Sequence, residues 1–356
     1  MKRFAVLLVA IITLASACSA HVKEEKETVA SKDKSVSVEK KATSLPDPRE
    51  ITGLSAVEGI PDPAVIEGEF SQKLPVTVTD VEGRSVTITD TSRILALDIT
   101  ATLSRTIIAL GFGDSIVGRS VSSTETMLAD LPVVSSDGIA LNAEAILNLH
   151  PTVVFTDRTL GPPEVISQIQ AAGIPVVITE SDHSVDTVGT EIEAVASALG
   201  VPEAGKALSK RAEQEITAAK EQIAKWAPKD PLKIAFLYVR GTAGVFFIFG
   251  GEEYGAIDLI EGVGGVDIAA KTGITGLTPA NAESLLAMNP EVIFTMTGGL
   301  ESTKGMEGLL ARPGVSSTIA GKKQRVVTIP DGLSLAFGPQ TGDVLLAVAR
   351  ALYGVK

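Results

Sequence analysis

The chain has 356 residues and a formal net charge of -12, because 43 Asp or Glu residues outnumber 31 Lys or Arg residues. At about 150 residues per domain this length suggests two domains, and a single cysteine excludes a small module held together by disulfides. The excess of acidic residues would repel a phosphate backbone, so we expect no nucleic-acid partner.

The N-terminus has the pattern of an export signal. Two basic residues precede the apolar segment 4–14, which is too short for an ordinary transmembrane helix. Residues 15–17 are small and stand directly before Cys18, which resembles a bacterial lipobox. We expect a signal peptide over residues 1–17, a diacylglycerol group on Cys18 and a place at the extracytoplasmic face of the cell membrane, held only by this lipid anchor. An ordinary secretory signal with an incidental cysteine is the alternative.

A polar segment follows the signal. Residues 23–41 are rich in Lys, Glu and Ser and lack aromatic residues, so they cannot bury enough apolar surface to offset the entropy of ordering the chain. We expect residues 18–71 to be the lipidated cysteine and a flexible spacer. The first folded element is predicted to be a β-hairpin, with strands at 76–79 and 86–89 around a turn that contains a glycine.

Short runs of Val and Ile then alternate with amphipathic stretches, which predicts a parallel sheet flanked by helices. The expected elements are strand 94–97, helix 101–110, strand 153–155, helix 163–172, strand 176–178 and one long helix starting at Pro202. The alternation resumes at Ile234. We therefore expect an N-terminal lobe over residues 72–201, a linking helix over 202–228 and a C-terminal lobe over 229–356.

An internal repeat relates the two predicted lobes. Residues 142–155 align without a gap on residues 281–294, with seven of fourteen positions identical, and residues 94–98 align on 234–238. Two copies are too few for a solenoid. The sequence predicts an α/β fold of two similar Rossmann-like lobes, each a mostly parallel sheet flanked by helices, joined by one long helix. A ligand cleft is expected between the lobes, at the carboxyl ends of the strands.

The export signal, the spacer, the hairpin, the paired lobes and the single linking helix together resemble a helix-linked (class III) periplasmic binding protein of an iron-complex or cobalamin ABC importer. Residues 236–244 and 296–302 further resemble the haemin-binding HmuT-type lipoproteins of corynebacteria and related actinobacteria. The resemblance covers the chain from Leu74 to its end.

This resemblance implies a lipoprotein that is not an enzyme. It would capture haem, iron protoporphyrin IX, in the cleft between the lobes and deliver it to an ABC permease and its ATPase. It would act as a monomer, with cell-surface haem-binding proteins as further partners.

The resemblance assigns the axial ligand of the haem iron to Tyr238. Ferric iron favours anionic oxygen ligands, and tyrosinate is an established axial ligand of haem. Arg240 lies two residues on, hence on the same strand face, where its charge would favour the ionised phenol. Met296, which matches the family's methionine, and His183 are candidates for support or for a second axial ligand. Alternatively, Tyr238 packs at a sheet edge and Arg240 is solvated.

One position departs from the family pattern. The family places a haem-ligating histidine in a Gly-His-x-Leu stretch of the first lobe, where this chain has Ile139. His150 lies about 12 Å further along the following helix, at 1.5 Å per residue, and cannot replace it. The departure leaves open the second axial ligand and also the choice between haem and a ferric siderophore. Arg119 and Arg158, which each follow a strand-like stretch, are candidate partners for the haem propionates.

The repeated Asn-Ala-Glu motif has two interpretations. Asn142 and Asn281 are good helix N-caps, and an acid two residues later complements the helix dipole by about 0.3 to 1 kcal/mol. The resemblance adds that one exposed glutamate in each lobe, here Glu144 and Glu283, pairs with arginines of the permease.

Other functions have less support. The dinucleotide-binding, Walker and Gly-x-Ser-x-Gly motifs of common enzyme families are missing from the sequence. The alternatives to haem delivery are a lipoprotein that binds a ferric siderophore, another iron complex or cobalamin, and a sensory or adhesion lipoprotein with the same fold. A permease and an ATPase encoded beside the protein would favour transport.

Overall fold

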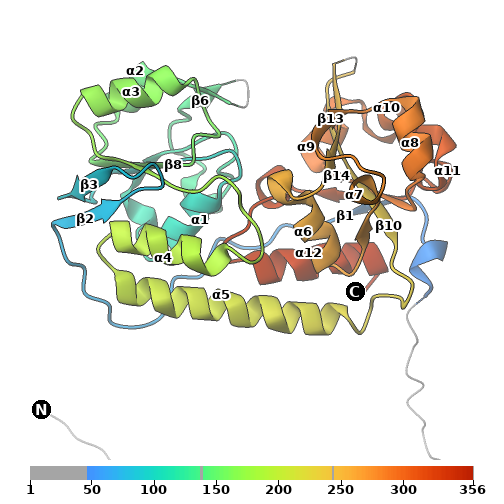
Figure 1. Cartoon of the computed structure of the whole chain (residues 1–356), viewed down its shortest axis with the longest axis horizontal. Helices are drawn as coiled ribbons and strands as arrows, with labels where there is room; N and C mark the ends of the chain where they lie inside the picture. The colour runs from blue at the N-terminus through green and yellow to red at the C-terminus, as the bar shows by residue number, and fades with distance from the viewer. Residues whose placement is uncertain (1–45, 137–138, 243, 356) are drawn as a thin grey trace, which may run out of the picture. The chain divides into compact units, whose positions relative to one another are not determined.

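A computed structural model describes residues 46–136, 139–242 and 244–355. The expected signal peptide and Cys18 lie outside these residues. By their contacts, residues 44–356 group into one unit. It contains a seven-stranded and a four-stranded sheet, each flanked by helices, and two further two-stranded sheets (Figure 1). Within the described ranges, we find no helix with the length and apolar character that a bilayer-spanning helix needs.

The first lobe is built on a sheet of four parallel strands in the order β5-β4-β8-β9. Its strands are β2 (Val76–Thr79), β3 (Ser85–Ile88), β4 (Ile94–Leu97), β5 (Ile116–Gly118), β6 (Ser135–Ser136), β7 (Ala140–Leu141), β8 (Val153–Thr156) and β9 (Val176–Ile178). Its helices are α1 (Thr102–Ala109), α2 (Ala143–Asn148), α3 (Pro163–Ala171) and α4 (Val188–Ala198). The antiparallel pairing of β2 with β3 confirms the predicted hairpin.

The second lobe has a mixed sheet in the order β1-β15-β14-β10-β11-β13, with β12 also paired to β10. Its strands are β1 (Leu54–Ala56), β10 (Lys233–Arg240), β11 (Val245–Gly250), β12 (Val266–Asp267), β13 (Gly276–Pro279), β14 (Val292–Met296) and β15 (Val326–Ile329). Its helices are α6 (Ala256–Gly262), α7 (Ile268–Lys271), α8 (Ala282–Met288), α9 (Thr297–Ser302), α10 (Gly305–Leu310), α11 (Ile319–Lys323) and α12 (Thr341–Tyr353).

The sequence repeat corresponds to a structural repeat. Ile94 of β4 pairs with Val153 of β8, and Ile234 of β10 pairs with Val292 of β14 in the same parallel arrangement. The predicted α/β class, with two similar lobes and mostly parallel sheets, is confirmed.

Among the strands that the sequence did not predict, β11 lies beside Tyr238. The strand β10 continues through Tyr238 to Arg240 and pairs in antiparallel fashion with β11. The apolar run in β11 belongs to a hairpin, which the parallel pattern of the first lobe did not suggest.

The long helix α5 (Pro202–Ile223) runs beside both α4 and α12 (Figure 1). It buries a stripe of residues spaced three to four apart, as expected for an amphipathic helix. Its buried residues are Ala204, Gly205, Leu208, Ser209, Ala212, Ile216, Ala219 and Ile223. A Cβ on Gly205 would lie 2.5 Å from the Cβ of Ala196, so glycine permits the close approach of α4. The helix ends at Ile223, before the expected boundary at residue 228, and turns follow it.

The prediction that the flexible spacer extends to residue 71 is wrong for residues 46–71. Leu54 of β1 pairs with Val326 of β15 in the second lobe, whereas the backbone N–H of Ile66 donates to the carbonyl of Ala109 in the first. An extended chain with a three-residue strand has no helical or alternating pattern that sequence analysis would detect. This segment is a second covalent connection between the lobes, in addition to α5.

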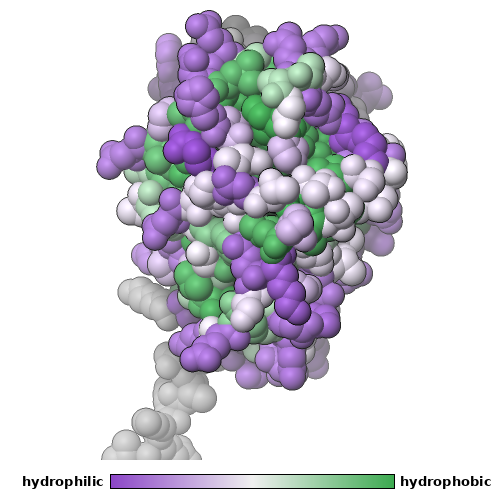
Figure 2. All heavy atoms as spheres, turned by 90° about the vertical axis from the view of Figure 1, so that its left-hand side faces the viewer, coloured by the Kyte–Doolittle hydropathy of each residue, from purple (hydrophilic) through white to green (hydrophobic). Residues whose placement is uncertain are grey.

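The hairpin β2–β3 covers part of the first lobe. A cavity of about 480 Å³ lies between this hairpin, β9, α1 and α4, and its lining is mainly apolar. Figure 2 shows this end of the molecule, where hydrophobic residues reach the surface in separate patches between hydrophilic ones.

Candidate functional site

Tyr238 lies on one face of the second sheet, and the pleat of β10 decides which residues accompany it. Alternate residues of a strand point to opposite faces, so Phe236, Tyr238 and Arg240 share a face while Leu237 and Val239 are buried on the other. This confirms the predicted common face of Tyr238 and Arg240. The β10–β11 register places Phe247 opposite Tyr238 and Phe249 opposite Phe236.

Four aromatic rings are connected here, with Phe249 in contact with each of the other three. The ring centroids of Phe236 and Phe249 are 5.5 Å apart, those of Tyr238 and Phe249 are 5.7 Å apart, and those of Phe249 and Tyr254 are 5.4 Å apart. These separations are typical of stabilising aromatic pairs. We call Phe236, Tyr238, Phe249 and Tyr254 the aromatic row.

Tyr254 was missed by the sequence analysis. Its side chain is 53% exposed, and its backbone has a φ of 63°, in the left-handed region that a bulky residue rarely adopts. Such a conformation persists only where the surroundings hold it. The sequence offered one signal for this residue. Tyr254 is one of only three tyrosines and follows two glycines and two glutamates, a composition typical of a loop.

Arg240 contacts both of the side chains with which the sequence analysis grouped it. Its Cζ atom stands 5.1 Å from the centroid of the Tyr238 ring, within the range of a cation–π contact. Its Nη2 lies 3.5 Å from the sulfur of Met296, and also donates to Oδ1 of Asp331 at 2.5 Å. Asp331, which begins the turn after β15, was not singled out from the sequence.

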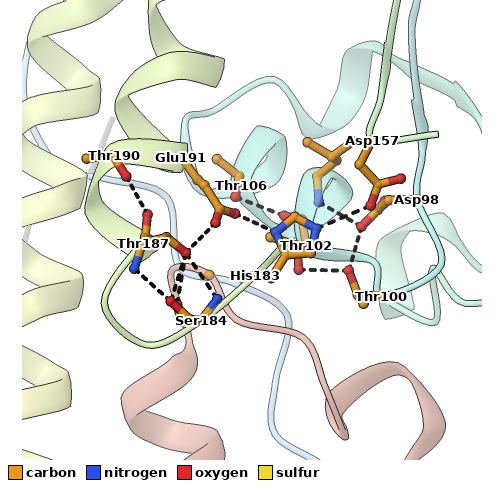
Figure 3. Close-up of polar contacts among 12 residues, drawn as sticks. Asp98, Thr100, Thr102, Thr106, Asp157, His183, Ser184, Thr187, Thr190 and Glu191 are labelled. Carbon is orange, nitrogen blue, oxygen red and sulfur yellow. Dashed lines mark hydrogen bonds and ion pairs between the residues drawn. The ribbon is translucent and has the colours of Figure 1, made fainter. Parts of the chain in front are cut away.

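His183 is not available as an axial ligand, which contradicts that part of the site prediction. The residue is 6% exposed, and Figure 3 shows its ring between two carboxylates. Nδ1 lies 2.6 Å from Glu191 and Nε2 lies 3.2 Å from Asp157. Burial alone would lower the pKa of His183, but the hydrogen bonds to Asp157 and Glu191 outweigh burial and raise this pKa to about 10. A protonated imidazole has no lone pair for iron.

Asp98, at the end of β4, completes this buried cluster. Burial and the nearby charge of Asp157 raise the pKa of Asp98 to about 7, although His183 acts against them. In the described part of the chain, no group of three or more His, Cys, Asp or Glu residues is arranged to hold a metal ion. With the contacts of His183 to Asp157 and Glu191, the cluster forms a buried network of titratable groups within the first lobe.

The two candidate propionate partners have different surroundings. Arg158 forms an ion pair with Glu82 in the β2–β3 hairpin, with Nε 2.5 Å from Oε1 and Nη2 3.0 Å from Oε2. Arg119 donates only to backbone carbonyls, including those of Ser120 and Ser123, over long distances of 3.4 Å. The Arg119 guanidinium therefore has no carboxylate partner among the described residues.

Ile139 is 55% exposed and lies beside the short strand β7. The two docking candidates, Glu144 and Glu283, are exposed in the first turns of α2 and α8. Asn142 accepts a hydrogen bond from the backbone of Ala145, and Asn281 makes a capping box, so both predicted N-caps are confirmed.

A separate cavity of about 940 Å³ lies between the loop that carries His183, the end of α5 and α6. Asp186, Glu252, Asp258 and Glu261 line it together with Lys220. No member of the aromatic row lines it.

Comparison with known proteins identifies the family to which the chain belongs. The family model of periplasmic binding proteins matches residues 99–333. The structure of the haem-binding protein HmuT is 52% identical, covering 87% of this chain and all of that chain, with a TM-score of 0.84. The periplasmic haem-binding protein RhuT from Roseiflexus sp. RS-1, in its apo form, is 35% identical, covering 74% of this chain and 98% of that chain, with a TM-score of 0.68.

A third similar structure is the periplasmic haem-binding protein BhuT in complex with two haems. It is 30% identical, covering 74% of this chain and 98% of that chain, with a TM-score of 0.65. No curated protein matches the sequence.

The family match takes in strands of both sheets together with α5, and the similarity to HmuT extends over nearly all of the described residues. Members of this family are extracytoplasmic substrate-binding proteins that serve an ABC permease and its ATPase. The chain belongs to the periplasmic binding protein family and has its two-lobed class III fold.

Proposed function

We propose that this protein captures haem and delivers it to an ABC permease, with Tyr238 as the axial ligand of the iron. The observation that carries the proposal is the Tyr238–Arg240 pair on a face of aromatic rings. The phenol would supply an anionic oxygen to ferric iron, and the neighbouring rings would cover the apolar porphyrin. The similarity to three haem-binding proteins supports haem as the cargo.

The spacing of three substituted residues in HmuT supports the assignment of Tyr238 and Arg240 to the haem site. In the variant structures of HmuT, alanine replaces a tyrosine, an arginine two positions after it and a histidine 99 positions before it. Counted from Tyr238, the same spacings lead to Arg240 and to Ile139. The first lobe would thus offer no nitrogen ligand at that position. We expect a high-spin ferric complex that is five-coordinate, or weakly six-coordinate through water or Met296.

The test is a titration of the purified protein with haemin at neutral pH. Tyr238→Phe keeps the aromatic ring and removes the phenol oxygen, so most of the affinity and the phenolate-to-iron absorbance should be lost. Tyr254→Phe, which makes the same chemical change elsewhere in the aromatic row, is the matched control and should retain both. Equal affinities and identical spectra for wild type and Tyr238→Phe would exclude Tyr238 as the ligand.

The replacement of a histidine by Ile139 favours one alternative, a ferric siderophore. Such a ligand brings its own oxygen atoms and needs no bond from the protein to the iron. A ferric hydroxamate or catecholate that displaces haemin stoichiometrically from the wild type, and binds Tyr238→Phe equally well, would establish this alternative.

Arginine partners for the haem propionates are part of the proposal. Arg119 is the stronger candidate, because Arg158 would first have to leave Glu82. Loss of haem affinity in Arg119→Ala, with little change in Arg158→Ala, would support this order.

The lipid anchor is also proposed. Cys18→Ala should release the protein from the membrane fraction without changing its thermal unfolding, because the described fold begins after that residue. Retention of the variant in the membrane fraction would contradict the lipoprotein assignment.

A further inference from the structure

The Arg240 guanidinium is held by groups from three separate segments of the second lobe. Nη2 donates to Oδ1 of Asp331 and contacts the sulfur of Met296, and the guanidinium carbon lies over the ring of Tyr238. Asp331 is 91 residues away from Arg240 in the sequence. Only the fold brings the two together.

Asp331 is itself fixed by a second hydrogen bond. While Oδ1 accepts from Arg240, Oδ2 accepts from the backbone N–H of Gly298 at 2.8 Å. Each carboxylate oxygen thus has its own donor. The carboxylate cannot rotate about its bond to Cβ without losing one of two hydrogen bonds, of which the bond to Arg240 is charge-assisted.

The two glycines at the start of α9 leave the space that this arrangement needs. A Cβ on Gly299 would lie 2.8 Å from Nη1 of Arg240, and a Cβ on Gly298 would lie 3.1 Å from Oδ2 of Asp331. Contacts this short would displace one group or the other. Because Gly298 and Gly299 have no side chains, Arg240 and Asp331 can lie against the start of this helix.

We propose that Asp331 is a positioning residue of the haem site, which holds the Arg240 guanidinium over the Tyr238 ring. This proposal deepens the proposed function, because a role of Asp331 in haem binding rests on the capture of haem by this protein. Arg240 has a long side chain that loses rotamer freedom when it is held in one place. Asp331 selects the one arrangement in which the cation lies beside the phenol before the ligand arrives.

The first test uses the haem-free protein and is independent of any ligand. A guanidinium above an aromatic ring has an Nε–H resonance shifted by the ring current, and Arg240→Lys identifies that resonance by its disappearance. In Asp331→Ala the resonance should move to the range of solvent-exposed arginines. In Asp331→Asn, which keeps an acceptor oxygen, it should stay near its wild-type position.

The second test measures haemin affinity. Asp331→Ala should weaken binding by about tenfold, the size expected for the loss of one hydrogen bond to a charged group. Asp331→Asn should recover part of this loss. The double variant Arg240→Ala/Asp331→Ala should bind no more weakly than Arg240→Ala alone, because Asp331 acts through Arg240.

Asp230→Ala is the matched control, because Asp230 also forms an ion pair with an arginine of the second lobe, Arg49. The side chain of Asp230 is 90% exposed. It should leave both readouts unchanged. An unmoved Arg240 resonance in Asp331→Ala, or additive affinity losses in the double variant, would overturn the inference. Failure of the wild type to bind haemin would refute the proposed function, while the resonance would still decide whether Asp331 positions Arg240.

Discussion

The two lobes share one scaffold and use the same positions in different ways. The repeat aligns Asp98 at the end of β4 with Tyr238 on β10, and Asp157 after β8 with Met296 at the end of β14. In the first lobe these positions hold two buried carboxylates beside His183. In the second lobe they hold a phenol and a thioether that are only partly buried and lie against Arg240.

This difference separates a structural use of the strand ends from the ligand-binding use proposed above. The charged side chains around His183 in the first lobe contact one another, so few of their polar atoms remain for a ligand. The second lobe leaves a ring and a cation at the surface of an apolar face. If Tyr238 binds the iron as proposed, the duplicated fold places ligand chemistry in one copy and a buried charge network in the other.

The largest expected effect concerns a feature that both lobes retain, the exposed glutamate near the start of α2 and of α8. If both lobes dock on the permease, Glu144→Ala or Glu283→Ala alone should reduce haem-dependent uptake, and the double variant should abolish it. Haemin binding by the purified double variant should equal that of the wild type. Loss of binding would show that these carboxylates serve the ligand site instead, and an effect of only one glutamate would contradict docking through both lobes.

The second prediction breaks the buried cluster of the first lobe. His183→Gln removes the cation that faces Asp157 and Glu191, and removing one partner of a buried ion pair costs about 3 to 5 kcal/mol. The free energy of unfolding, measured by denaturant titration, should fall by an amount in this range. His150→Gln is the matched control, because His150 is exposed, and it should have little effect. Equal stabilities of the wild type and His183→Gln would show that the cluster contributes nothing.

The third prediction is the pH dependence of the same cluster. The folded protein holds the proton of His183 to a pKa of about 10, above the ordinary value of 6.5. The resulting stabilisation is complete below pH 6.5 and is lost as the pH rises through 10. Asp98, whose pKa is raised from 3.8 to about 7, acts in the same direction at lower pH.

Thermal unfolding measured at intervals from neutral pH to pH 10 should therefore show a decline for the wild type that His183→Gln reduces. Parallel curves for the two proteins would contradict a proton held by His183.

Much of the framework was predictable, because it depends on local pattern. The strands at 94–97 and 176–178 were predicted to the residue, since short Val and Ile runs between helices are a strong signal. Tyr238 and Arg240 were placed on one face by the two-residue period of a strand alone.

What the sequence could not supply depends on distant contacts. Asp331 becomes a partner of Arg240 only through the parallel order of β10, β14 and β15. His183 was a candidate iron ligand in the sequence, which does not show that folding brings Asp157 beside its imidazole. The first strand, β1, is paired with β15, although Leu54 and its partner Val326 lie far apart in the sequence.

The fourth prediction sharpens the comparison within the second lobe. Gly299→Ala places a methyl group against both Nη1 of Arg240 and the carbonyl of Val239, each at 2.8 Å, whereas the nearest atoms to a methyl group on residue 298 belong to the Asp331 carboxylate. Overpacking of this kind costs about 1 to 3 kcal/mol. Gly299→Ala should therefore weaken haemin binding more than Gly298→Ala. The reverse order would contradict the arrangement of Arg240 against α9.

The smallest effect concerns the attachment of Arg49 and β1, which contact the second lobe. Arg49 forms an ion pair with Glu291 at 2.8 Å, and β1 then adds to the sheet beside β15. Arg49→Ala should lower the free energy of unfolding by no more than about 1 kcal/mol, because the pair is only partly buried. The loss should be local, so amide hydrogen exchange should accelerate in β1 while the strands of the first lobe keep their protection.

Asp230→Ala removes the exposed partner of the same arginine and provides the control, with no measurable change expected in either quantity. The contrast decides which lobe holds Arg49 and β1 in place. If Arg49→Ala accelerates exchange in β1 alone, the start of the described chain is held by the lobe that carries Tyr238. Equal acceleration in β2 and β3 would show instead that the segment is fastened to both lobes as one unit.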